Sequence, residues 1–200
     1  MLRCASSFVI GKIRDSSLFS LPFPRREGIS HVSPPLAGGD QGEGEEGMPY
    51  TIKRTFHTGF CVGDLDWTIG FFQQVLGFKL VDKAPRDPRN QSFVSGVPGA
   101  QVMIAYMDCA GHSLELQDYS GPSDRQEFRP RMVDQGHFHL SFVVDDVDAV
   151  VAACKKYDAR ITTLSPYPME VDQGPNKGNK IQFVVLPDGV HLEFTTRVNE

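Results

Sequence analysis

The chain repeats one sequence pattern twice, and this repeat restricts the possible folds more than any other feature. Residues 57–66 read HTGFCVGDLD and residues 139–148 read HLSFVVDDVD, so His, Phe, Val and two Asp recur at matching places 82 residues apart. A second pair of segments, GHSLEL at 111–116 and GVHLEF at 189–194, matches in the same way. Alternating apolar residues are typical of half-buried strands, and an acidic turn after a strand can cap a helix. The two copies should therefore fold alike.

Each copy carries one helix and several strands. In the first copy, apolar residues recur at helical spacing over 65–76, and Gly77 stands where a left-handed residue can end the helix. The strands that follow predict the order βαβββ in both copies, which is an α+β fold. The boundaries are module one at 52–119, a linker at 120–136 and module two at 137–197. Placed side by side, the modules would form one curved, mostly antiparallel sheet around a metal site.

The repeat also places one His and one Glu at matching strand positions in each copy. The four residues are His57, Glu115, His139 and Glu193. Because side chains alternate between the two faces of a strand, the His and Glu of one copy can point to the same side of their module. Two imidazoles and two carboxylates suit Ni, Co, Zn, Mn or Fe, with positions left for water or substrate. A single strand His is more often structural than a ligand, but four residues in repeated positions predict a mononuclear divalent-metal site.

Composition argues against several other classes of function. The four cysteines lie far apart and form no CxxC pair, which argues against a disulfide scaffold and a thiolate zinc site. The net charge of -5 gives no reason to expect a nucleic-acid partner. No apolar run reaches the roughly 18 residues that a membrane-spanning helix needs. We therefore expect a small-molecule partner, with neither nucleic acid nor membrane involved.

The first 47 residues differ in composition from the rest of the chain. Residues 1–28 are basic and rich in serine, which loosely resembles a mitochondrial or plastid presequence. Residues 34–47 are rich in Pro, Gly and Glu, which is typical of disorder. Met48 follows at once, so translation could equally begin there. We exclude residues 1–47 from the domain at 48–200 and expect a cytoplasmic protein, or a mitochondrial or plastid one if residues 1–28 are a presequence.

Together these motifs resemble the vicinal oxygen chelate (VOC) superfamily, also called the glyoxalase/bleomycin resistance/dioxygenase family. The motifs that carry the resemblance are HTGFCVGDLD at 57–66, FQQVLGF at 72–78, HSLEL at 112–116, GHFHLSFVVDDVDA at 136–149 and PDGVHLEF at 187–194. The resemblance implies a metal that chelates two neighbouring oxygens of a small oxygenated substrate and makes the C–H beside a carbonyl more acidic. It implies that Glu193 is a ligand and the proton carrier, and that Glu115 is the second catalytic candidate and the permanent ligand. It also implies a site within one chain or across a homodimer, and we expect the homodimer.

Glyoxalase I (lactoylglutathione lyase) and methylmalonyl-CoA epimerase are the branches that this chain resembles most. Cys61 stands where the resemblance to glyoxalase I implies a glutathione-binding Arg, and Tyr119 stands in place of an Asn. The epimerase commonly has Gln in place of Glu115, and a Glu base in a segment that here, at 82–94, has Asp but no Glu. We predict a metal-dependent lyase, isomerase or epimerase that moves a proton next to a carbonyl. The alternatives are a non-catalytic small-molecule binding or resistance protein and an Fe-dependent dioxygenase.

Five further residues are candidate substrate contacts. Arg86, Arg89 and Lys177 could bind an anionic tail such as a CoA phosphate or a carboxylate, although solvated loop charges explain them equally well. His137 shares a strand face with the second ligand histidine and could line the pocket, although a simple edge histidine is the plainer interpretation. Tyr119 is included because it stands at the position of a glutathione contact.

Overall fold

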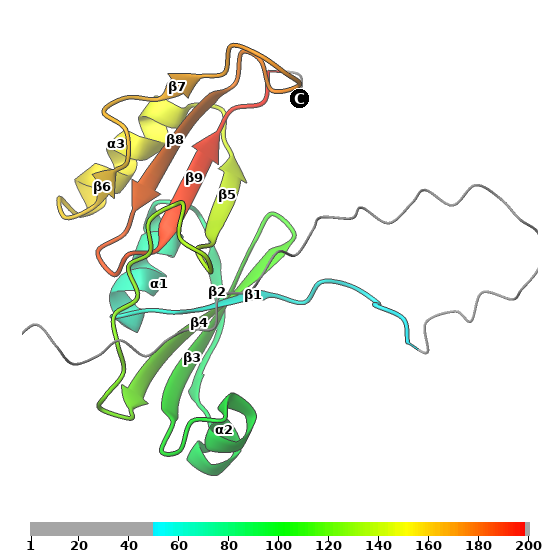
Figure 1. Ribbon diagram of the computed structural model, residues 1–200, viewed down its shortest axis with the longest axis vertical. Helices are drawn as coiled ribbons and strands as arrows, with labels where there is room; N and C mark the ends of the chain where they lie inside the picture. The colour runs from blue at the N-terminus through cyan, green and yellow to red at the C-terminus, as the bar shows by residue number, and fades with distance from the viewer. Residues whose placement is uncertain (1–49, 199–200) are drawn as a thin grey trace, which may run out of the picture. The chain divides into compact units, whose positions relative to one another are not determined.

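Two modules of the same design follow one another along the chain (Figure 1). The computed structural model describes residues 50–198, so the predicted tail at 1–47 lies outside the described residues. Module one contains β1 (Thr58–Cys61), α1 (Leu65–Gln74), β2 (Lys79–Pro85), α2 (Pro88–Ser95), β3 (Gln101–Cys109) and β4 (His112–Gly121). Its sheet has the order β1-β4-β3-β2, in which the β1–β4 pair is parallel and the other two pairs are antiparallel.

Module two repeats this design with shorter strands. Its elements are β5 (His139–Val143), α3 (Val147–Tyr157), β6 (Thr162–Thr163), β7 (Met169–Glu170), β8 (Lys180–Val185) and β9 (His191–Thr195). β9 lies between β5 and β8, both β6 and β7 pair with β8, and the β5–β9 pair is parallel. The α+β class and the βαβββ order are confirmed. Module one has an additional helix, α2, and module two has two short strands where one was expected.

The acidic turns after β1 and β5 begin α1 and α3, as the repeat predicts. The backbone N–H of Trp67 donates to Asp64 Oδ1 over 2.9 Å, and that of Ala149 donates to Asp146 Oδ1 over 2.9 Å. Both aspartates have extended backbone dihedrals, which is the conformation of a residue that caps a helix N-terminus. Within residues 50–198, none of the helices is long and apolar enough to cross a membrane.

Both modules contribute to one hydrophobic core. Phe60 and Leu114 of module one and Leu192 and Phe194 of module two are buried in the same cluster, together with apolar residues of α1 and α3. Full burial of one such side chain contributes about 1.5–3 kcal/mol. The Phe60 ring also lies 6.0 Å from the ring of Phe138, across the boundary between the modules. Because both sheets turn their apolar faces to this shared core, the opposite face of each sheet points away from it.

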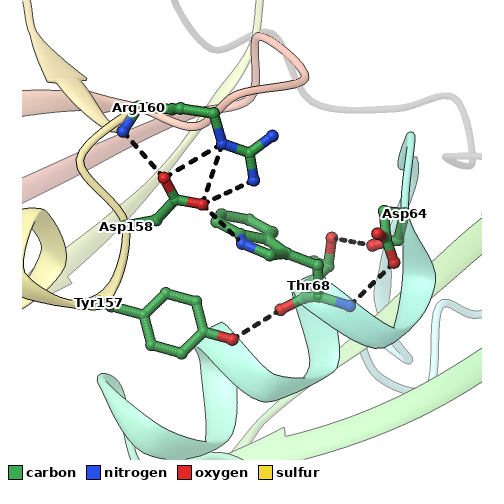
Figure 2. Close-up of polar contacts among 6 residues, drawn as sticks. Asp64, Thr68, Tyr157, Asp158 and Arg160 are labelled. Atoms are coloured by element: carbon green, nitrogen blue, oxygen red, sulfur yellow. Dashed lines mark hydrogen bonds and ion pairs between the residues drawn. The ribbon is translucent and has the colours of Figure 1, made fainter.

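Four side chains, which we call the clamp, join α1 to the end of α3 (Figure 2). The clamp consists of Trp67, Tyr157, Asp158 and Arg160. Trp67 Nε1 donates to Asp158 Oδ2 over 2.9 Å, and the Tyr157 hydroxyl donates to the Trp67 carbonyl over 3.1 Å. Arg160 Nη2 donates to the same aspartate over 2.6 Å. Gly70 makes room for the clamp, because a Cβ at this position would lie 2.6 Å from the Tyr157 hydroxyl oxygen.

The two sheets are separate within one chain, with four strands in module one and five in module two. This arrangement differs from the single curved sheet that the sequence predicts. The shared core explains the difference, because the modules meet through the apolar faces of their sheets and through α1 and α3.

Candidate metal centre

The first His–Glu pair, which we call half-site one, lies on the face of the module-one sheet that points away from the core. His57 immediately precedes β1, Glu115 lies on β4, and Gly59 pairs with Glu115 in the parallel register of these strands. His57 Nε2 is 3.4 Å from Glu115 Oε2. The Glu115 side chain is 11% exposed, and a carboxylate this buried needs partners to offset its lost hydration.

The second pair, half-site two, has the same layout in module two. His139 begins β5, Glu193 lies on β9, and Ser141 pairs with Glu193 in the parallel register. His139 Nε2 is 3.3 Å from Glu193 Oε2. Leu192 and Phe194, the neighbours of Glu193 along β9, are buried in the core, so the Glu193 side chain lies on the opposite face.

The spacing within each pair fits two ligands of one metal ion. Ligand atoms about 2.1 Å from an ion lie about 3.0–3.4 Å apart in octahedral or tetrahedral coordination. The two N–O distances, 3.4 Å and 3.3 Å, agree with this spacing. In both pairs the Nε2 atom of the histidine faces the carboxylate and is the nitrogen that would bind the metal. An imidazole with a carboxylate is a donor set that suits divalent ions such as Ni, Co, Zn, Mn or Fe.

Within one chain the predicted ligands form two pairs and not one cluster. Across residues 50–198, no group of three or more His, Cys, Asp or Glu side chains is placed to hold a metal ion. The two half-sites lie on the outward faces of two sheets whose inward faces share a core, and this packing keeps them apart. The four-residue site therefore stays a prediction that one chain alone does not complete.

Glu115 is held on both carboxylate oxygens. The Tyr106 hydroxyl donates to Oε1 over 2.5 Å, and Gln117 Nε2 donates to Oε2 over 2.6 Å. Tyr106 faces Glu115 in the antiparallel β3–β4 register, and the hydrogen bond to Glu115 raises the pKa of Tyr106. Gly59 leaves the space beside Oε2 open, because a Cβ there would lie 3.1 Å from this oxygen. The carboxylate is therefore fixed in orientation yet accessible from the side of β1.

Glu193 has different surroundings at the same places. Phe183 faces Glu193 in the antiparallel β8–β9 register, where module one has Tyr106. The Phe183 ring lies 5.2 Å from the ring of His139 and provides no hydrogen-bond donor. Thr195 takes the place of Gln117 and donates instead to the Thr196 carbonyl over 3.1 Å. In the part of the chain that the structure describes, His139 is the one polar side-chain partner of Glu193.

Comparison with known proteins identifies the family of this chain. Residues 54–194 match the sequence model of the Glyoxalase/Bleomycin resistance protein/Dioxygenase superfamily. The chain belongs to this superfamily. It is 30% identical over 153 residues to a 2-epi-5-epi-valiolone epimerase of an Actinomyces species, covering 74% of this chain and 81% of that one. It is 29% identical over 140 residues to a lactoylglutathione lyase of Haemophilus influenzae, covering 69% and 88%. A glyoxalase family protein of Bacillus cereus has the same fold, with a TM-score of 0.63, 22% identity, and coverage of 74% and 97%.

In this member of the glyoxalase superfamily, two further histidines stand beside half-site two. The ring of His137, a predicted substrate contact, lies 5.7 Å from the ring of His139 and 4.8 Å from that of His191. Burial, and then the charge of His137, lower the pKa of His191. His191 also borders an apolar cavity of about 510 Å³ between the linker and β8. His191 is not among the predicted site residues, although its spacing two residues before Glu193 places both side chains on one face.

The remaining candidate substrate contacts fall into two groups. Tyr119 lies on the same face of β4 as Glu115, and its hydroxyl accepts a hydrogen bond from Gln91 Nε2 of α2 over 2.6 Å. The Arg86 guanidinium lies 5.8 Å from the centre of the Tyr106 ring, next to half-site one. Arg89 and Lys177 are exposed and, among residues 50–198, make no hydrogen bond or ion pair with either half-site. Their role in substrate binding stays a prediction.

Proposed function

We propose that this superfamily member is a divalent-metal-dependent enzyme that moves a proton on the carbon next to a carbonyl group of a small oxygenated substrate. The observation that carries the proposal is the pair of half-sites, each with a histidine nitrogen and a carboxylate oxygen at the spacing of metal ligands. The relatives named as a lactoylglutathione lyase and as an epimerase support an activity of the lyase, isomerase or epimerase type.

Each residue of the half-sites has a role in this proposal. His57, Glu115, His139 and Glu193 hold the metal. A bound divalent metal supplies Lewis-acid polarisation of the substrate carbonyl, which makes the adjacent C–H more acidic. Glu193 accepts the proton from this carbon and donates it back, as a general base and then a general acid. The open space beside Gly59 admits a substrate oxygen next to Glu115.

The complete site requires a second copy of the chain. Half-site one of one copy would face half-site two of its partner, because the two half-sites of one chain lie on outward faces of separate sheets. A two-fold symmetric homodimer places two such sites at one interface. We therefore propose a homodimer with one metal per site and two sites per dimer.

Metal analysis of the purified chain tests the proposal. Loading with Ni²⁺ or Co²⁺ should give about one ion per chain in a dimer, as follows from one site per protomer, and the size should be measured by light scattering. A panel with a 2-oxoaldehyde hemithioacetal, a branched acyl-CoA and a hydroxylated cyclic ketone should show metal-dependent exchange of a substrate hydrogen with deuterium oxide. A chain that binds none of these metals contradicts the proposal. Tight substrate binding that survives chelation and Glu193→Gln supports a non-catalytic binding protein instead, and oxygen uptake with catechols supports a dioxygenase.

A mixing experiment tests where the site forms. His57→Ala disables half-site one, and His139→Ala disables half-site two, so neither homodimer has a complete site. A heterodimer of the two variants has one intact site, so refolding an equal mixture should restore about a quarter of the wild-type metal sites. A site within one chain predicts no recovery.

A further inference from the structure

The two carboxylates of the proposed metal centre differ in how firmly the protein holds them. Glu115 accepts hydrogen bonds on both oxygens, from Tyr106 over 2.5 Å and from Gln117 over 2.6 Å. Hydrogen bonds to an ionised acceptor are among the stronger ones in proteins, and two donors on different oxygens fix the plane of the carboxylate. Glu193 has the histidine of its own half-site as its one polar side-chain partner among residues 50–198. Its carboxylate can therefore turn about its side-chain bonds at a lower cost than that of Glu115.

The difference comes from single residues at matching positions. Tyr106 faces Glu115 across the β3–β4 hairpin, and Phe183 faces Glu193 across the β8–β9 hairpin. The ring of each also packs on the ring of its half-site histidine, with Tyr106 5.6 Å from His57 and Phe183 5.2 Å from His139. The two aromatic rings thus make the same contact with their half-site histidines, and only Tyr106 carries a hydroxyl group that can donate to the carboxylate.

We infer that Tyr106 and Gln117 are positioning residues that fix Glu115 as a static metal ligand, whereas Phe183 leaves Glu193 as the single carboxylate that moves a proton. The inference rests on the proposed function and refines it. In the first step the substrate C–H bond breaks, its electron pair stays on the substrate, and the proton forms an O–H bond on Glu193. In the second step the same carboxylate returns the proton to the substrate. When the proton goes to the neighbouring carbon, the former hydroxyl group releases its proton to water, and the former carbonyl oxygen takes one up from water.

A single base has a stereochemical consequence. Glu193 can reach the substrate from one face, so the proton leaves and returns on that face. Inversion at carbon requires a donor on the opposite face, and Glu115 is fixed by its two donors. The centre therefore favours transfer of hydrogen between neighbouring carbons of a hydroxy carbonyl compound, and disfavours epimerisation at one carbon.

The reciprocal variants Tyr106→Phe and Phe183→Tyr test the inference in the full chain. Because each exchanges the aromatic residue of one half-site for that of the other, each is the matched control of its counterpart. Tyr106→Phe should weaken Ni²⁺ binding about 10-fold, the lower end of the effect of removing a group that orients a ligand. Phe183→Tyr should keep Ni²⁺ affinity at or above wild type and slow turnover about 10-fold, because the new hydroxyl holds Glu193. Ni²⁺ titration by calorimetry decides the first point, and circular dichroism checks that both variants are folded.

The stereochemical consequence is tested with the (R) and (S) forms of 1-hydroxy-1-phenylpropan-2-one in deuterium oxide, because transfer of hydrogen to the neighbouring carbon then gives a different compound, 2-hydroxy-1-phenylpropan-1-one, and not the opposite form. Exchange of the α-hydrogen in one form without conversion to the other supports the inference, and interconversion of the two forms with uptake of deuterium overturns it. Equal Ni²⁺ affinities of the two reciprocal variants also overturn it. If the wild-type chain binds no divalent metal, the proposed function itself fails, which is a different outcome from metal binding without the asymmetry.

Discussion

In module one, two hydrogen-bond donors hold the carboxylate of Glu115. In module two, the ring that faces Glu193 carries no donor. The His–Glu distances are nevertheless alike, at 3.4 Å and 3.3 Å, and the strand registers match. Strand pairing therefore sets where each carboxylate lies, and the residues beside it set how many donors hold it. Two substitutions between the repeats, Tyr106 to Phe183 and Gln117 to Thr195, separate a carboxylate held by two donors from one without them.

The largest expected effect comes from replacing each carboxylate by its amide. Glu193→Gln should lower turnover by about 1,000-fold, because a general base typically contributes 100- to 10,000-fold, and it should retain bound Ni²⁺. Glu115→Gln should lose both turnover and Ni²⁺. Its new NH₂ group would point at the donor group of Tyr106 or of Gln117, where an acceptor is needed. Turnover and metal content of the two purified variants should be measured together. Equal metal loss in both would remove the distinction between the half-sites.

A smaller effect is expected from closing the space beside Glu115. Gly59→Ala would place a methyl group 3.1 Å from Glu115 Oε2, which is tighter than ordinary contact and cannot be relieved without disturbing the fixed carboxylate. Ni²⁺ affinity should fall about 10-fold. Ser141→Ala at the matching position of module two is the control and should leave Ni²⁺ affinity within about twofold of wild type. If the control loses as much affinity as Gly59→Ala, crowding of Glu115 is not the cause.

The contacts that join the modules should affect stability and leave the difference between half-sites unchanged. Tyr157→Phe removes the hydrogen bond to the Trp67 carbonyl and should lower the free energy of unfolding by about 1 kcal/mol, the net contribution of one hydrogen bond. Urea denaturation measures the change, and Ni²⁺ titration of the same variant should match wild type. Weakened Ni²⁺ binding in this variant would show that the clamp also shapes the metal centre.

The smallest expected effect concerns acid stability. The guanidinium of Arg160 holds the pKa of Asp158 well below its usual value of 3.8. A carboxylate with a depressed folded-state pKa contributes stability above its unfolded pKa and loses it as the pH falls through the folded value. Asp158→Asn should therefore lower the midpoint of urea unfolding at pH 7. It should also reduce the further loss of stability between pH 4 and pH 2. If the urea midpoint of this variant falls between pH 4 and pH 2 as steeply as that of the wild type, other carboxylates cause the loss of stability.

The sequence alone predicts the repeated elements because their causes are local. Asp64 and Asp146 cap the helices that follow them, as their places in the repeat indicate. The pairing of each His with its Glu also follows from the repeat, since both recur at fixed positions on adjacent strands. The order βαβββ includes no helix over Pro88–Ser95, although Asp87 followed by Pro88 is a recognisable helix start.

Other features depend on contacts that spacing along the chain does not show. Tyr106 and Phe183 become equivalent when the hairpin registers are known, because residues on opposite strands face each other according to where the turn falls. The separation of the sheets depends on how the modules pack. The repeat is compatible both with modules joined side by side in one sheet and with two sheets that share a core. His191 could have been found by parity with Glu193, whereas its contact with His137 needed the fold.

In the proposed homodimer, the outward direction of the two half-sites would make metal binding depend by mass action on the concentration of the protein as well as on that of the metal. A centre assembled from two copies dissociates on dilution, so its apparent affinity for Ni²⁺ should fall as the chain is diluted below the dissociation constant of the dimer. The amount of chain in a compartment would then help to set how much of it is active. Metal, in turn, would stabilise the dimer by the same free energy by which dimer formation strengthens metal binding.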